Sequence, residues 1–319
     1  MFTFVPRNLT DPMKIIYTTL LLGLLLASCK KESPEEKTVS DALKTAQTSN
    51  NDSSFVALSN AINNFIEVKS YADTTTARLI LKAAHLSESK NRFDDAINYY
   101  ELYMAHYADR PDQADKLMAV IGISEKQTSK QLSQILYKSF VNRFPNDPRA
   151  KDVDAKIELK EISVDSTLRH IGMNMFNDST FRLNEPMANL YINGCELAAA
   201  ADPKLVSAPE HLHRAAETAR TLRDIPRAIK IYDWIITVYP ESPRGATSLF
   251  LKAFTYDNDL KDYTKAAKYY NEFLTKYPNN DFSESAKFLL QNLGKSEEEL
   301  KKILDEKSKE NTENKKNVK

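Results

Sequence analysis

The side chains that could bind a metal ion or carry out acid–base chemistry are few and scattered in this 319-residue sequence. The five histidines are His85, His106, His170, His211 and His213. His211 and His213 are two residues apart in a helical pattern, so they point about 200° apart and cannot bind one metal ion together. We therefore expect each histidine to face solvent or to line a groove, and we expect no metal site.

No other pattern indicates catalysis. No glycine-rich phosphate loop follows a strand, and no segment has a convincing strand pattern. The acidic run Glu297-Glu298-Glu299 lies near a predicted helix start, where it favours the helix dipole. The single tryptophan, Trp234, lies within a predicted helix and is expected to pack there rather than to stack on a sugar. The sequence therefore predicts a protein that is not an enzyme and has no catalytic cofactor.

The charge balance bears on the partners. The chain carries 44 basic and 44 acidic side chains, so its formal net charge is zero. Nucleic-acid binding usually needs a basic stripe, so nucleic acid is not expected as a partner. A content of 28% charged and 42% hydrophobic residues is typical of a helix-rich globular chain.

The N-terminal region has the pattern of an export signal. Lys14 precedes an apolar run from Ile15 to Ala27. Its length falls within the usual span of about 7–15 residues for a signal-peptide core and below the roughly 17–25 residues of a spanning helix. Met13 is expected to be the true start, because the residues before it resemble no part of a signal. An ordinary secretory signal and a short membrane anchor are the alternatives.

The run ends in Leu26-Ala27-Ser28-Cys29, which resembles the lipobox of bacterial lipoproteins. The resemblance implies that residues 1–28 are a signal peptide and that Cys29 becomes the acylated first residue of the mature chain. Several acyl chains on one residue would give stable membrane anchoring. Only Cys195 would then remain, which cannot form an intramolecular disulfide and lies on an apolar helical stripe. We expect a buried structural thiol there.

The residues after the cysteine bear on localisation. In enterobacterial lipoproteins an aspartate after the cysteine favours retention at the inner membrane, and this chain has Lys30 instead. The resemblance implies an outer-membrane protein facing the periplasm. Short runs of lysine and acidic residues accompany surface export in some Bacteroidetes lipoproteins, so surface display stays open. Residues 29–39 are charged without an apolar pattern and are expected to form a flexible tether.

One helical pattern recurs along the rest of the chain. A small residue is followed by aromatic or apolar residues four and seven positions later, and in three of the sets by a proline twelve positions later. The sets are Ala96-Tyr100-Tyr103, Ser133-Tyr137-Phe140-Pro145, Ala228-Tyr232-Ile235-Pro240 and Ala266-Tyr270-Phe273-Pro278. Steps of four and seven place side chains on one face of a helix, and the proline stops that helix.

A second helix with a small residue precedes each of these sets. The preceding residues are Ala84, Gly122, Ala216 and Ala253, which lie 11 to 13 positions earlier. Two helices that cross at small residues indicate a helix hairpin, because a bulky residue at the crossing would force them apart. This pattern resembles the tetratricopeptide repeat (TPR), which implies an all-α solenoid of stacked hairpins.

The repeats suggest boundaries within the chain. Residues 40–150 are predicted to hold an N-terminal helical hairpin and the first TPR-like repeats, and residues 151–185 an irregular insertion with a helix and loops. Residues 186–294 are predicted to hold the C-terminal repeats, opened by a helix with Pro186 in its first turn and closed by an end helix with Gly294 as its C-cap. Residues 295–319 form a charged tail that we expect to fray.

The TPR resemblance also implies that the first helix of each hairpin lines a concave groove. Carried over residue by residue, the groove positions are Arg78, Leu81, His85, Glu88, Glu210, His213, Glu217, Arg220, Thr247, Phe250, Phe254 and Asp257. A peptide or protein segment is expected to bind there, with Phe250 or Phe254 as its apolar anchor. The alternative is that these residues form only a solvated wall and that the contacts lie on an edge.

The function predicted from this resemblance is a lipid-anchored interaction scaffold. The pattern is similar to the TPR lipoproteins of the outer-membrane β-barrel assembly machine (BamD-like), which implies an accessory role in outer-membrane protein assembly and envelope proteins as partners. Periplasmic TPR proteins that coordinate envelope constriction in cell division are similar too. A cell-wall or glycan-processing enzyme, or a glycan-capturing surface lipoprotein, is the alternative from another class.

Overall fold

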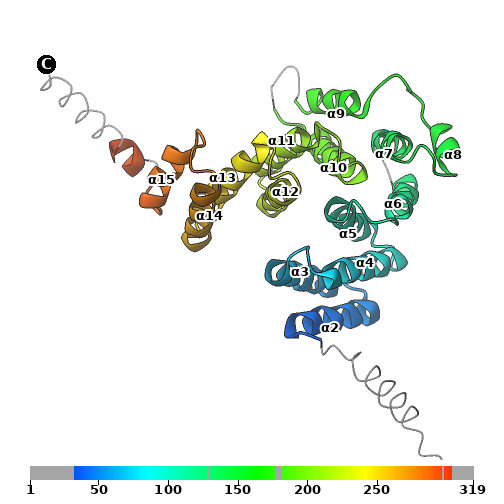
Figure 1. Cartoon of the computed structure of the whole chain (residues 1–319), viewed down its shortest axis with the longest axis horizontal. Helices are drawn as coiled ribbons and strands as arrows, with labels where there is room; N and C mark the ends of the chain where they lie inside the picture. Colours follow the sequence, from blue (N-terminus) through cyan, green and yellow to red (C-terminus); the bar gives the residue numbers. More distant parts are fainter. Residues whose placement is uncertain (1–31, 128–129, 177–181, 297, 304–319) are drawn as a thin grey trace, which may run out of the picture. The chain divides into compact units, whose positions relative to one another are not determined.

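The computed structural model describes residues 32–127, 130–176, 182–296 and 298–303. These residues form α-helices joined by turns, and among them the only β-type pairing is a single bridge between Phe176 and Leu183 (Figure 1). The prediction of an all-α chain is confirmed. The predicted signal peptide, Cys29 and residues 304–319 of the tail lie outside the described residues.

The chain divides into two compact units, residues 1–79 and 80–319, which are described separately. The first unit holds α2 (Pro34–Ser49), α3 (Asp52–Lys69) and the start of α4 (Thr74–Ser89). Helices α2 and α3 pack as a hairpin around Val39, Leu58 and Ile62, which are all buried.

The start of α2 corrects the predicted tether. The helix begins at Pro34, so residues 34–39 are helical rather than flexible. The Ser33 hydroxyl oxygen accepts a hydrogen bond from the backbone N–H of Glu36 at 3.2 Å, Pro34 starts the helix, and Glu35 and Glu36 lie in its first turn. These are the standard features of a stable N-terminus, and they outweigh the absence of an apolar pattern.

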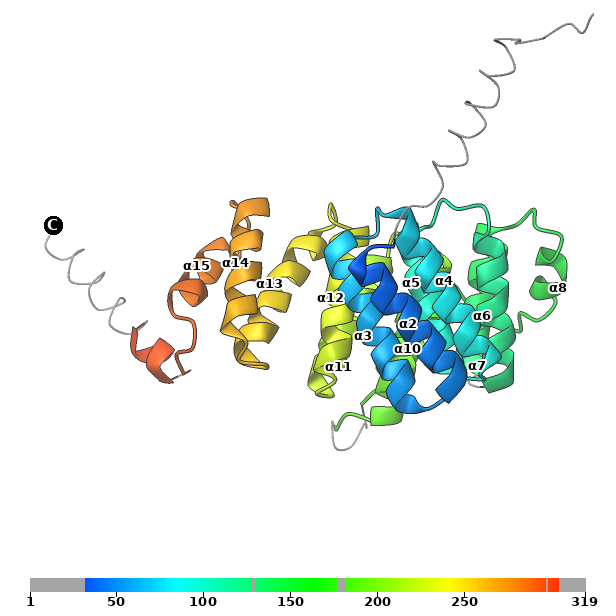
Figure 2. The same ribbon diagram turned by 90° about the horizontal axis from the view of Figure 1, so that it is seen from below.

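The second unit holds the remaining helices. They are α5 (Phe93–His106), α6 (Gln113–Gln127), α7 (Lys130–Arg143), α8 (Ala150–Asp154), α9 (Val164–Met173), α10 (Glu185–Ala201), α11 (Ala208–Thr221), α12 (Ile225–Val238), α13 (Pro243–Asn258), α14 (Tyr263–Lys276) and α15 (Ser283–Gln291). Helices α11 to α14 follow one another side by side, and α15 covers α14 (Figures 1 and 2).

The helix crossings lie where the spacing predicts them. Ala216 and Ala228 on α11 and α12, and Ala253 and Ala266 on α13 and α14, are 0% exposed, as are Ala84 and Ala96. Tyr232 and Tyr270, four residues after the second alanine of each pair, are also fully buried. The predicted register of these hairpins is therefore confirmed.

The hairpin of α6 and α7 departs from that register. A Cβ atom added at Gly122 would meet nothing within 4 Å, so this glycine does not lie at the crossing. Instead the hydroxyl groups of Ser124 and Ser133 form a buried hydrogen bond of 3.1 Å. The small residue that the crossing requires is present, but it lies two positions later than predicted.

A tyrosine–proline pair follows the end of both α12 and α14, namely Tyr239-Pro240 and Tyr277-Pro278. Helix α12 ends at Val238, and the Tyr239 N–H donates to the carbonyl oxygen of Ile235 at 2.9 Å. Gly245 of α13 packs against this stop, because a Cβ atom there would lie 2.6 Å from the Pro240 carbonyl oxygen. The hydroxyl of Tyr277, in the next stop, donates to that same oxygen at 3.2 Å, so consecutive stops are linked.

Helix α10 is the most enclosed helix of the second unit. It contacts α5, α7, α9 and α11, and Asn184 caps its start, with Pro186 in the first turn as predicted. Cys195 is 0% exposed, and burial raises the pKa of its thiol well above the usual range. The prediction of a buried structural thiol is confirmed.

Candidate functional site

The predicted groove residues lie on α4, α11 and α13. In the first unit, Arg78 of α4 forms an ion pair with Glu36 of α2. In the second unit, His85 of α4 is exposed, with its ring 6.0 Å from that of Tyr100. The structure therefore gives Arg78 a partner within its own unit.

Two of the carboxylates predicted to line the groove, Glu88 and Glu217, accept hydrogen bonds from tyrosines of their own hairpins. The Tyr100 hydroxyl donates to Glu88 Oε2 at 2.7 Å, and Tyr232 donates to Glu217. Tyr137 makes the same kind of bond to Glu125 at 2.8 Å, and burial together with this carboxylate raises the pKa of Tyr137 to about 12. Glu88 and Glu217 thus each hold the two helices of one hairpin together, a role that the TPR resemblance did not predict.

Phe250 corrects the prediction of an apolar anchor. It is 8% exposed, and its ring stacks on Phe282 with 4.9 Å between centroids and lies 5.7 Å from Phe273. Phe250 is therefore part of the C-terminal core with Leu249 and Ala253, and no partner can insert beneath it. Phe254, one turn later on α13, is half-buried and is therefore the more accessible of the two rings.

Phe254 lies beside an arginine that links two hairpins. The guanidinium of Arg220 lies over the Phe254 ring, 5.2 Å from its centroid. Its Nε donates to Asp259 Oδ2 at 2.6 Å, and Arg223 lies 3.5 Å from the other oxygen of Asp259. Arg220 and Phe254, both predicted groove residues, are thus brought together by the packing of α11 against α13.

A second link between α11 and α13 is centred on Glu210. Arg244 Nε donates to Glu210 Oε2 at 2.7 Å, and Arg214 Nε donates to Glu210 Oε1 at 2.8 Å. The hydrogen bond from Arg244, followed by that from Arg214, lowers the pKa of Glu210 to about 2. The imidazole of His213 lies nearby and is half-buried, and burial lowers its pKa, so it is uncharged at neutral pH.

We call this set of side chains the α11–α13 surface. It consists of Glu210, His213, Arg214, Arg220, Arg223, Arg244, Phe254 and Asp259. Its arginines outnumber its carboxylates, and the side chains of Arg214 and Arg223 are 65% and 81% exposed. The surface can therefore bind a carboxylate beside an apolar side chain. The sequence did not predict Arg214, Arg223, Arg244 and Asp259 as site residues, because they lie outside the groove positions that the TPR resemblance implies.

Two predicted groove residues on α13 are less accessible. The Thr247 hydroxyl donates to the Pro243 carbonyl oxygen at 3.2 Å within the helix. Asp257 is half-buried, and burial raises the pKa of its carboxyl. Neither contributes an open charged group to the α11–α13 surface.

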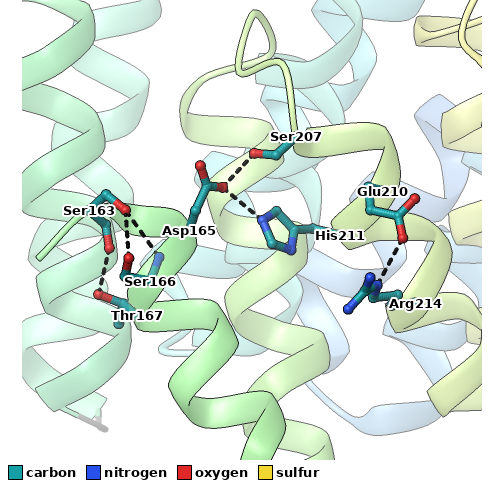
Figure 3. Close-up of polar contacts among 8 residues, drawn as sticks. All are labelled: Ser163, Asp165, Ser166, Thr167, Ser207, Glu210, His211 and Arg214. Carbon is teal, nitrogen blue, oxygen red and sulfur yellow. Dashed lines mark hydrogen bonds and ion pairs between the residues drawn. The ribbon is translucent and has the colours of Figure 1, made fainter.

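Serine, histidine and aspartate side chains meet between α9 and α11 (Figure 3). Asp165 Oδ1 accepts from the Ser207 hydroxyl at 2.5 Å and lies 2.8 Å from His211 Nε2. In a catalytic triad the histidine stands between the other two, whereas here the aspartate does. The arrangement joins α9 to the start of α11. His211, which we expected to face solvent or a groove, has a side chain only 15% exposed.

Trp234 of α12 is 4% exposed, which agrees with the packing role predicted for it. In the described part of the chain, no group of three or more histidine, cysteine or acidic side chains is placed to hold a metal ion. No helix among the described residues has the length and apolar character needed to cross a membrane.

Comparison with known proteins adds a family match for one hairpin. Residues 247–280, which include most of α13 and all of α14, match the family model of the tetratricopeptide repeat. A solved structure of the TPR2AB domain of yeast Sti1, in complex with pHSP90, is similar at 12% sequence identity and a TM-score of 0.29, covering 81% of this chain and 97% of that one. The comparison with curated proteins found no match.

Proposed function

We propose that this all-α chain, a TPR-type array of helix hairpins, is a non-enzymatic scaffold that binds segments of other proteins. The observation that carries the proposal is the α11–α13 surface. Stacked hairpins place side chains from different repeats next to one another, which gives an extended binding face. The partner is expected to supply an extended segment with an acidic residue next to an apolar one.

The physical basis is the preorganisation of two arginines on this surface. Arg220 and Arg244 are held by carboxylates of the chain itself, so they are preorganised, and their guanidinium groups have donors left for a ligand carboxylate. The exposed Arg223 adds charge at the edge. Phe254 offers the adjacent apolar contact. Aromatic and arginine side chains together are typical of the residues that dominate binding energy.

We further propose that the scaffold is anchored by a lipid on Cys29 in the outer membrane and faces the periplasm. Support comes from the Leu-Ala-Ser-Cys sequence and the lysine that follows it. In this setting the partners would be envelope proteins, and an accessory role in outer-membrane protein assembly is the specific function that we propose. Cys29→Ala is expected to abolish incorporation of labelled palmitate and to release the protein from the membrane fraction. Unchanged labelling would contradict the anchor without affecting the proposal for the α11–α13 surface.

The binding proposal is tested by crosslinking the full chain in native envelopes and identifying the crosslinked proteins by mass spectrometry. Phe254→Ala and Arg223→Glu are compared with Arg110→Ala, an exposed arginine in the turn between α5 and α6. We expect a partner whose recovery falls at least about fivefold, roughly 1 kcal/mol, with either surface variant and is unchanged in the control. Equal recovery with all variants would contradict binding at the α11–α13 surface. Recovery of assembly components would support the specific role, and recovery of division proteins would replace it.

A further inference from the structure

Four charged side chains form a cluster inside the second unit, where α5, α10 and α12 meet. Glu101 of α5 is 3% exposed and Glu196 of α10 is 1% exposed. Arg227 and Lys230 reach them from α12. We call these four side chains the buried ionic cluster. It joins helices that are far apart in the sequence and belong to different hairpins.

The two carboxylates of the cluster are unequally stabilised. Arg227 Nε donates to Glu196 Oε2 at 2.9 Å, and its Nη2 donates to the same oxygen. Lys230 Nζ lies 3.6 Å from Glu196 Oε1 but 4.0 Å from Glu101 Oε2, and it donates instead to Asn98 Oδ1 at 3.0 Å. A separation of 4.0 Å is too long for a hydrogen bond. Glu101 is thus the carboxyl group with the weaker partner.

Electrostatics make the ionised form of Glu101 costly. It is buried beside a second carboxylate, Glu196, which already has the guanidinium of Arg227. A buried ion without close donors loses its hydration and gains little in return. A neutral, protonated carboxyl group fits the same space at a lower free energy.

We propose that Glu101 is a proton-dependent lock, which holds α12 and α10 against α5 when protonated and weakens their contact when it ionises. The lock connects helix α5 to the hairpin that α11 and α12 form. Because α12 is the packing partner of α11, ionisation would loosen the support of one of the hairpins that carry the α11–α13 surface. The lock does not depend on the proposed function.

The direction of the pH effect follows from the surroundings of Glu101. Burial, and next the charge of Glu196, raise its pKa from 4.5 to about 8, whereas Lys230 and Arg227 of α12 oppose the shift. The closed junction therefore binds a proton that the opened one releases. The contribution of Glu101 to the stability of the junction is complete below about pH 4.5 and is lost as the pH rises through about 8.

Hydrogen exchange measured by mass spectrometry on the full chain between pH 6 and pH 9 tests the lock. After correction for the intrinsic exchange rate, opening of residues 93–106 and 225–238 is expected to increase at least about tenfold over this range. Glu101→Gln, which imitates the neutral acid, is expected to remove the increase and keep the junction closed at pH 9. Asp94→Asn, at an exposed acid of the same helix, should retain it.

Two results of the hydrogen-exchange experiment would overturn the proposed lock. A wild-type opening constant that does not change with pH would overturn it, and so would an increase that persists in Glu101→Gln. Circular dichroism shows whether Glu101→Gln keeps its helix content. If that variant unfolds, carbonyl infrared spectra of the wild type decide: a buried protonated carboxyl band that disappears between pH 7 and 9 supports the lock, and its absence at pH 7 refutes it.

Discussion

Phe250→Ala tests whether the aromatic residue predicted as a groove anchor is in fact part of the core. Truncation of a buried phenylalanine to alanine typically costs about 3–5 kcal/mol. Phe250 is 8% exposed and touches Phe282, which is itself 39% exposed and can move to fill part of the cavity. We therefore expect the lower end, about 3 kcal/mol. Phe254→Ala removes a half-buried ring and is expected to cost about 1 kcal/mol.

The assay must detect local unfolding, because each hairpin of such an array is stabilised mainly by its neighbours. Denaturant titration followed by circular dichroism gives the global loss, and hydrogen exchange of residues 243–276 gives the loss in α13 and α14. We expect Phe250→Ala to destabilise this segment by more than Phe254→Ala, whereas Phe254→Ala should have the larger effect on partner recovery. Equal stability losses, or a Phe250→Ala variant that is as stable as the wild type and loses its partner, would refute it.

Two other predictions concern the packing of the hairpins. Ala253→Phe, at a helix crossing where Ala253 is 0% exposed, should lower the free energy of unfolding by about 1–3 kcal/mol. Lys295→Ala, at an exposed site after α15, should leave the melting temperature unchanged. Equal melting temperatures of the two variants would contradict the predicted register. Glu210→Gln removes the ion pair with Arg244 and should cost up to about 1 kcal/mol at pH 7. The ion pair contributes its full stability to the folded chain above about pH 4.5, and this contribution is lost as the pH falls through about 2. The difference in melting temperature between Glu210→Gln and the wild type should therefore be smaller at pH 3 than at pH 6.

The hairpins were predictable because their determinants are local. Residues four or seven positions apart lie on one face of a helix, and a proline ends the helix. The positions of α11 and α12 could therefore be predicted from Ala216, Ala228, Tyr232 and Pro240. The crossing of α6 and α7 was placed two residues too early, because serine fills the small-residue role there through a hydrogen bond. Small size was recognisable from the sequence, but the choice between Gly122 and Ser124 depends on how the helices rotate.

The candidate site was less predictable, because its charges bind partners from other helices. Glu88 and Glu217 at the groove positions accept hydrogen bonds from tyrosines, and the pairing of Arg220 with Asp259 spans two hairpins. The signal for the buried ionic cluster was present but is ambiguous in a single sequence. Glu101 follows two tyrosines and Glu196 follows Cys195, so each interrupts an apolar face, yet spacing does not reveal which cation on α12 will meet them.

The C-terminal end of α10 has a consequence for mutational tolerance. The residues from Leu197 to Ala201 are all 4% exposed or less, so the helix is surrounded on every side in its last turn. A scan of all substitutions along α11 or α14 should show tolerant and intolerant positions alternating with the helical period. Along the four alanines from Ala198 to Ala201 the scan should instead show a continuous block in which alanine, glycine or serine is accepted and every larger side chain is rejected. Sequence change in this protein is therefore expected to be slowest in a segment that consists only of alanines.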